Sequence, residues 1–195
     1  AVRTTINGYE AAQIANGKRD SRHRIEHIEL IDRHDIVRLG ALGIVASLQP
    51  THPPGAMDFD LEPSLSVIGK GRWADAFLWK TLADHGTPIA YSSDWPVTDV
   101  SIMRGLQASL TRTPYDATCG DECLSRYESL HAYTAGGAWA AHREAVTGHL
   151  KPGLAADLVL IDGNIETTPT GQLGQVPIAL TIAGGRITYD PKGQD

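Results

Sequence analysis

Strands that alternate with helices constrain this chain more than any other feature of its sequence. Short apolar runs typical of buried strands occur at 24–30, 44–48 and 88–92. Segments with helical spacing of apolar residues separate and follow them. The expected helices span 1–16, 33–42, 72–86, 101–113 and 125–144. Alternating strands and helices build βα units on a parallel sheet, so we expect an α/β fold.

The three expected strands all run into polar residues that can do chemistry. They end in the segments EH at 26–27, QPTH at 49–52 and SSD at 92–94, whereas their starts carry no comparable groups. Ligands of α/β folds bind at the carboxyl ends of parallel strands, so the pattern predicts an enzyme site there. Side chains alternate along a strand, so Glu26 faces the helices, where we expect it to be buried and paired with Arg24.

Each candidate site residue also has an ordinary structural interpretation. His27 would serve equally well as a hydrogen-bonded core histidine, and Asp94 as a helix cap after a strand. Gln49 and His52 lie in a proline-rich segment that would suit solvated loop residues. Trp95 is either a wall of a pocket or part of the core. Strand-end position alone does not decide between these interpretations.

Composition excludes several classes of partner. The 195 residues carry a net charge of -6 without a basic cluster, so we expect neither a nucleic acid nor a membrane partner. No apolar run approaches the ~20 residues of a membrane span, and no secretory signal opens the sequence, so we expect a cytoplasmic protein. Cys119 and Cys123 are then reduced thiols; a local disulfide and a metal site are the weaker alternatives.

The sequence pattern changes near residue 146, from alternating strands and helices to short β-type runs between turns. Turn residues become frequent, and β-type runs follow at 156–161, 178–184 and 185–190. Two consecutive glycines, Gly184 and Gly185, predict a tight hairpin between the last two runs. We therefore expect a small antiparallel β unit in residues 146–195, distinct from the βα units of residues 1–145.

Four motifs in order make the chain similar to a known family. They are HRIEH at 23–27, SLQPTH at 47–52, SSDWPV at 92–97 and GHLKPGLAADLVLID at 148–162. Together they resemble the amidohydrolase superfamily. Within it they resemble amidohydrolase family 3, the branch of YtcJ-like proteins and N-substituted formamide deformylase.

The resemblance implies a metal-dependent hydrolase with a (β/α)8 TIM barrel and a small β-sandwich. On this comparison residues 1–145 are the C-terminal part of the barrel, strands six to eight. Residues 146–195 are the C-terminal strands of the composite sandwich. His27 matches the metal-binding histidine of the sixth strand, and Asp94 the aspartate of the eighth. The family's other metal ligands have no counterpart in these 195 residues.

The same resemblance implies hydrolysis of a non-peptide C–N bond, in an amide or formamide, by a water that a divalent metal activates. Zinc is the expected metal. Asp94 would bind the metal and act as general base, His27 would bind the metal, and Gln49, His52 and Trp95 would contact a small amide-type substrate. A chain that holds part of this site is expected to be inactive by itself.

Two alternatives compete with a truncated enzyme. The first is a chain without catalysis, either an inert remnant or a fragment that self-associates into a homo-oligomer through open strand edges. The second is a phosphoacceptor signalling domain with Asp94 as the acceptor. That class needs further acidic residues and a lysine at neighbouring strand ends, and the segments at 26–27 and 49–52 supply only Glu26, which faces away.

Overall fold

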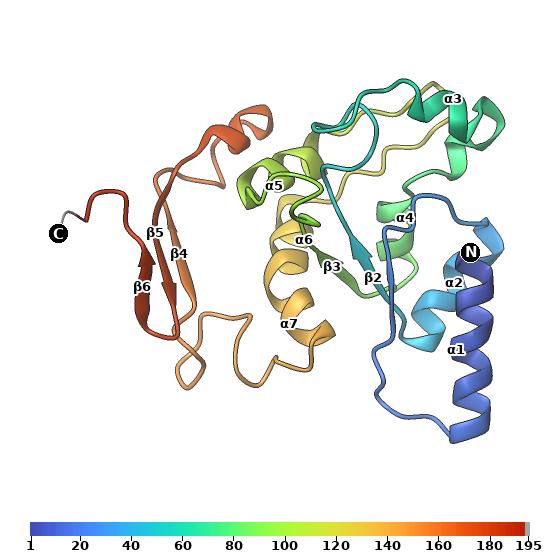
Figure 1. The fold of residues 1–195 in the computed structure, drawn as a ribbon, viewed down its shortest axis with the longest axis horizontal. Helices are drawn as coiled ribbons and strands as arrows, with labels where there is room; N and C mark the ends of the chain where they lie inside the picture. The colour runs from blue at the N-terminus through green and yellow to red at the C-terminus, as the bar shows by residue number, and fades with distance from the viewer. Residues whose placement is uncertain (194–195) are drawn as a thin grey trace.

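The computed structural model describes residues 1–193, which form two three-stranded sheets (Figure 1). The strands of the first sheet are β1 (Arg24–Glu26), β2 (Val45–Leu48) and β3 (Ile89–Tyr91). They pair in parallel in the order β1-β2-β3. The strands of the second sheet are β4 (Leu158–Ile161), β5 (Ile178–Ala183) and β6 (Arg186–Tyr189). They pair antiparallel in the order β4-β5-β6, which confirms the predicted change of character.

Helices connect and cover the parallel strands. The α-helices are α1 (Val2–Asn16), α2 (Arg33–Leu42), α3 (Ser64–Ile68), α4 (Trp79–Asp84), α5 (Ile102–Thr111), α6 (Arg126–His131) and α7 (Gly137–Ala140). Two 3-10 helices, η1 (Lys70–Asp75) and η3 (Thr170–Gln175), and one π-helical turn, η2 (Ala132–Gly136), complete the set. In Figure 1, α5, α6 and α7 lie between the two sheets, and α5 packs against η3.

Local sequence signals set the ends of several helices. The Asp32 carboxylate accepts a hydrogen bond from the His34 amide at the start of α2. Gly43 ends that helix in the left-handed conformation. Ser125 and Glu128 form a reciprocal capping box at the start of α6. These residues are polar or flexible groups that satisfy the unpaired backbone atoms of a helix end.

The main core lies between the parallel sheet and the helices that pack on it. β2 is the central strand and is buried at all four of its positions. Ile6 of α1, Leu39 of α2 and Leu82 of α4 are completely buried in the same cluster. A smaller cluster around Leu106 and Leu173 joins α5 to η3. The mixed α/β architecture is therefore confirmed. The assignment to strands six to eight of a barrel and the boundary at residue 146 remain predictions.

The first strand is shorter than the sequence predicts. The run 24–30 forms a strand only as far as Glu26, because His27 and Ile28 adopt positive φ angles of 67° and 47°. Glu26 pairs with Arg24 at 2.8 Å, as expected, but the expectation that it is buried is wrong. Its side chain is 46% exposed because it points away from the helices, on the face of the sheet opposite the buried Ile25.

A tertiary contact interrupts one of the expected helices, and a π-helical turn lies within another. The segment 72–86 contains η1 and α4, separated at Phe77, whose φ is 52°. The half-buried Arg112 side chain donates to the carbonyls of Ala76 and Phe77 and so holds them outside a helix. The segment 125–144 contains α6, η2 and α7 and ends at Ala140. A short helix, α3, also forms within the proline- and glycine-rich segment 53–70.

Two expectations from composition can be compared with the structure. Cys119 and Cys123 are both free thiols, so the local disulfide is absent. Within residues 1–193, none of the helices combines the length and apolar character that crossing a membrane requires.

A close backbone contact fixes η2 against β3. A Cβ atom at Gly136 would lie 2.3 Å from the carbonyl oxygen of Ile89. At the neighbouring Gly137 the nearest such atom is the carbonyl oxygen of Ala132 at 3.8 Å, an ordinary van der Waals distance. Only the first glycine is therefore required by packing.

We predict that Gly136→Ala lowers the free energy of unfolding by about 2 kcal/mol, because neither backbone can move away cheaply. Gly137→Ala is the matched control and should leave stability unchanged or raise it by up to about 1 kcal/mol, since alanine favours helix. Urea denaturation followed by circular dichroism measures both. Equal effects of the two substitutions would contradict the packing argument.

Candidate metal centre

Three donor side chains converge at the carboxyl edge of the parallel sheet. His27 directly follows β1, His52 follows β2, and Asp94 follows β3. One ligand atom from each residue lies within 4.8 Å of one from each of the others. Each of the three strands therefore contributes one potential metal ligand to the same small volume.

The backbone conformation directs the side chains of His27 and Asp94 towards the site. The His27 amide donates to the Ser47 carbonyl at 2.8 Å, which continues the pairing one residue beyond β1. The Ser92 amide does the same with the Leu48 carbonyl at 3.0 Å beyond β3. His27 and Asp94 then take positive φ angles of 67° and 57°. Such angles are uncommon outside glycine and occur often at functional sites.

Several buried polar atoms of this cluster have no hydrogen-bond partner. They are His27 Nδ1, His52 Nε2 and Gln49 Oε1. His52 and Gln49 are only 9% and 2% exposed. Buried polar atoms are nearly always satisfied in folded proteins, so atoms that are left over at one place indicate a ligand. Imidazole nitrogens and a carboxylate oxygen are donors that suit zinc, so the cluster fits a divalent metal ion.

The electrostatics of the cluster favour a neutral imidazole at His52. Burial lowers the pKa of the His52 side chain, and the neighbouring His27 adds to this effect. The Asp94 carboxylate opposes it, with its Oδ2 atom 3.9 Å from His52 Nε2. The rings of His27 and His52 stack with their centroids 5.6 Å apart. A neutral ring keeps one nitrogen lone pair free, which either a metal ion or a substrate hydrogen bond can use.

Hydrogen bonds join the loops that carry His52 and Asp94. Gln49 Nε2 donates to the Ser92 hydroxyl at 3.1 Å. The hydroxyl of Thr51 donates to that of Thr98, also at 3.1 Å, in a buried position. Both contacts cross from the end of β2 to the end of β3. They hold the two donors at a fixed separation.

The structure places four of the five predicted site residues together. His27, His52 and Asp94 form the cluster, and Gln49 lies beside it with its amide fixed by Ser92. Trp95 is 68% exposed and lies at the rim, so it is not part of the core.

Sequence reasoning missed one residue of this site. Phe59 packs edge-on against the His52 ring, with centroids 5.2 Å apart. Phe59 lies in a proline- and glycine-rich segment without periodicity, so the sequence carries no signal for this contact.

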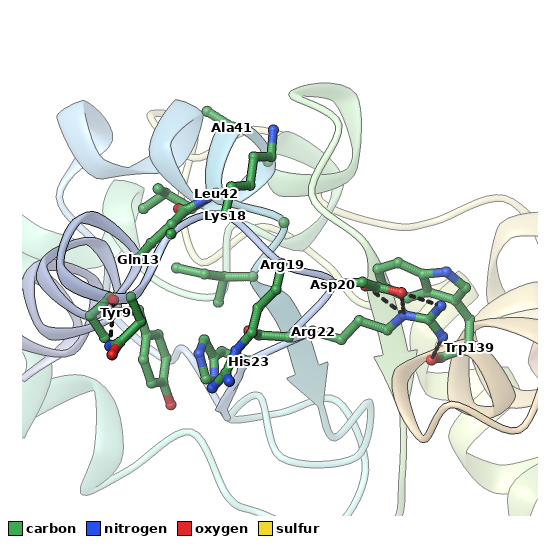
Figure 2. Close-up of a pocket in the computed structure, with 17 residues that line it drawn as sticks. Tyr9, Gln13, Lys18, Arg19, Asp20, Arg22, His23, Ala41, Leu42 and Trp139 are labelled. Carbon is green, nitrogen blue, oxygen red and sulfur yellow. Dashed lines mark hydrogen bonds and ion pairs between the residues drawn. The ribbon is translucent and has the colours of Figure 1, made fainter.

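A separate hollow of about 510 Å³ lies at the opposite, amino-terminal end of the strands. It is lined by α1, the end of α2 and the segment 17–23, and none of the predicted site residues borders it. Figure 2 shows Arg22 reaching Asp20 and Trp139 at one side of this hollow. The Arg22 guanidinium lies 4.4 Å from the centroid of the Trp139 ring and pairs with Glu144 at 2.7 Å. On this side of the hollow, Arg22 is therefore already occupied by Asp20, Glu144 and Trp139.

Comparison with known proteins places the chain within one family. The profile of the amidohydrolase family matches residues 1–189. The YtcJ protein of Bacillus subtilis is 30% identical over 97% of this chain and 36% of its own length. The protein LONG AFTER FAR-RED 3 of Arabidopsis thaliana is 34% identical over 94% of this chain and 31% of its own length. The chain thus spans about a third of the length of these relatives.

Solved structures agree with the sequence comparison. An uncharacterized metal-dependent hydrolase from Pyrococcus furiosus superimposes with a TM-score of 0.63 and 26% identity. The match covers 80% of this chain and 30% of that protein.

The cluster around Arg22 predicts a pH dependence of stability that does not involve the metal centre. The hydrogen bond from Arg22 lowers the pKa of Glu144 from 4.5 to about 2. A carboxylate with a depressed folded-state pKa stabilises the protein above its unfolded-state pKa, and this contribution is lost as the pH falls towards 2. Arg22→Met should therefore lower the melting temperature at pH 7 and reduce its fall between pH 5 and pH 2.

The matched control is Arg19→Met, because the Arg19 side chain donates only to the exposed Ser21 hydroxyl among the contacts of residues 1–193. It should leave the pH profile of the wild type unchanged. Parallel profiles for the wild type and Arg22→Met would show that the pair does not contribute to acid stability.

Proposed function

The chain belongs to the amidohydrolase family, and we propose that it carries one side of the active site of a metal-dependent hydrolase of non-peptide C–N bonds. The convergence of His27, His52 and Asp94 at the carboxyl edge of the sheet carries this proposal. A (β/α)8 barrel, with this chain as strands six to eight and residues 146–195 as part of a β-sandwich, belongs to the same proposal. The substrate is a small amide or formamide.

His27 and Asp94 are the metal ligands of this proposal. His27 comes directly after β1 and Asp94 three residues after β3, and both have a left-handed backbone that sets the direction in which the side chain leaves the chain. A bound divalent ion, most simply zinc, supplies a water of lowered pKa, near ~7, and polarises the scissile carbonyl. Two ligands do not complete a zinc site, so further donors come from residues outside this chain.

Asp94 also moves the proton. Its carboxylate is half-exposed and is therefore reachable by solvent and substrate. As general base Asp94 accepts a proton from the attacking water, and as the conjugate acid it gives that proton to the leaving amine. The bond from the Val97 amide to the Asp94 carbonyl, at 2.8 Å, fixes the turn that holds the carboxylate in reach.

His52 and Gln49 bind the substrate. With Asp94 only 3.9 Å from Nε2, His52 is placed to donate a hydrogen bond to an acceptor of the substrate that lies beside the general base. Gln49 Nε2 is occupied by Ser92, so its free Oε1 atom is turned towards a substrate N–H donor. An amide offers both a carbonyl acceptor and an N–H donor, which matches this pair. Trp95 contacts the substrate from the rim.

The first test is a zinc titration of this chain by calorimetry. We predict that His27→Ala and Asp94→Ala each weaken zinc binding by at least ~10-fold, since even supporting residues of metal sites contribute this much. His34→Ala is the control, because the His34 side chain is 93% exposed on α2 and does not belong to the donor cluster. Undiminished binding by both variants would exclude this metal site and favour the non-catalytic remnant.

The second test concerns the bond that is cleaved. In the full-length protein we predict that Asp94→Asn lowers kcat for acetamide-type substrates by about 10²- to 10⁴-fold, the usual contribution of a general base. An amide and an ester of the same acyl group should be compared under identical conditions. Preference for the ester, or unchanged kcat in Asp94→Asn, would contradict the proposed reaction.

A further inference from the structure

An aromatic side chain borders the metal centre from the loop after β2. The Phe59 ring meets the His52 ring edge-on, with an interplanar angle of 73° and centroids 5.2 Å apart. Phe59 remains 37% exposed, so part of its ring is available to a bound molecule. It packs against His52, which faces the substrate in the proposed function, so Phe59 borders the same site.

The loop that carries Phe59 is folded tightly on itself. The Gly55 amide donates to the Phe59 carbonyl at 2.7 Å. Gly55 has a φ of 76°, and a Cβ atom there would lie 2.7 Å from Leu61 Cδ2. The positive φ angle favours glycine at this position, whereas the exposed end of the Leu61 side chain could move aside. The turn sets where Phe59 is presented.

A single arginine ties this loop to the loop that carries Asp94. Arg104, in the first turn of α5, forms an ion pair with Asp58, the neighbour of Phe59. Its Nε atom also lies 3.7 Å from Asp99, in the segment between Asp94 and α5. Arg104 thus holds both loops from one side, opposite the Gln49–Ser92 contact.

The two loops beside the cluster carry apolar and acidic side chains but offer no free cation. The exposed apolar side chains of these two loops and the start of α5 are Phe59, Leu61, Trp95, Val97, Val100 and Ile102. Between residues 53 and 69, and again between 92 and 103, the sequence contains no lysine, arginine or histidine. Arg104 is already paired with acidic residues. A negatively charged substituent would therefore lose its hydration here without gaining a partner.

We propose that Phe59 determines the specificity of this site and that Arg104 is its positioning residue. The substrate class that fits is an amide with an uncharged aryl or branched alkyl substituent, whereas a carboxylated substituent is rejected. The aryl ring of the substrate would pack, stacked or edge-on, against the exposed part of the Phe59 ring. This inference rests on the proposed function, because it places the substrate beside His52.

The decisive measurement is the binding of amide probes, because it does not require turnover. Dissociation constants of phenylacetamide, propionamide and 4-carboxyphenylacetamide should be measured by ligand-observed NMR on the full-length protein. We expect phenylacetamide to bind tightest and the carboxylated probe weakest. Phe59→Ala should raise the dissociation constant of phenylacetamide about tenfold, the discrimination typical of a hydrophobic pocket contact. The dissociation constant of propionamide should stay the same. Phe59→Leu should restore most of the loss, and Tyr127→Ala, which removes an exposed aromatic ring from α6, should change nothing.

The role of Arg104 is tested by the kinetics of the zinc-loaded protein. Arg104→Gln and Asp58→Asn should both raise KM for phenylacetamide several-fold, while kcat for propionamide stays at the wild-type value. A merely structural role of the ion pair would lower kcat for both substrates together.

Failure of this inference differs from failure of the proposed function. If the zinc-loaded protein hydrolyses none of the amides, the proposed function is wrong, whereas the binding preferences are still measured by NMR. If Phe59→Ala weakens all three probes equally, or if the carboxylated probe binds tightest, the specificity assignment is overturned.

Discussion

The in-register pairing of three short parallel strands is the interaction on which the rest of the structure depends. β2 lies between β1 and β3 and is buried at every position. Because the strands run in one direction, their carboxyl ends reach the same edge of the sheet. Two further backbone bonds, His27 to Ser47 and Ser92 to Leu48, extend the pairing up to the cluster. The sheet therefore sets the distances among the three donor side chains.

The cluster itself is where the structure departs from its locally preferred state. His27 and Asp94 adopt left-handed backbone angles that neither residue type prefers, and buried polar atoms of Gln49 and His52 lack partners. Both departures are unfavourable by themselves. The buried strand below and the cross-links between the loops keep them in place. Departures of this kind that gather at one strand edge are typical of functional sites.

The errors of sequence-based reasoning have specific physical causes. The expected helix 72–86 breaks because Arg112, far away in sequence, binds the carbonyls of Ala76 and Phe77. The expected strand 24–30 stops at Glu26 because His27 and Ile28, with positive φ angles, bend the backbone at the site. Phe59 gave no signal, since its role arises from a ring contact with His52 across an irregular loop. In each case a long-range contact or a site geometry overrides local preference.

The sequence by itself determined the alternation of strands and helices, the antiparallel C-terminal sheet, and the family, because these depend on periodicity, turn residues and motifs in order. It also named the residues at the three strand ends. Only the tertiary structure decided which of them meet, since that depends on register and on the backbone angles beyond each strand. The tertiary structure brought His52 Nε2 to 3.9 Å from the Asp94 carboxylate and placed Phe59 against the His52 ring. It left the Trp95 side chain mostly exposed.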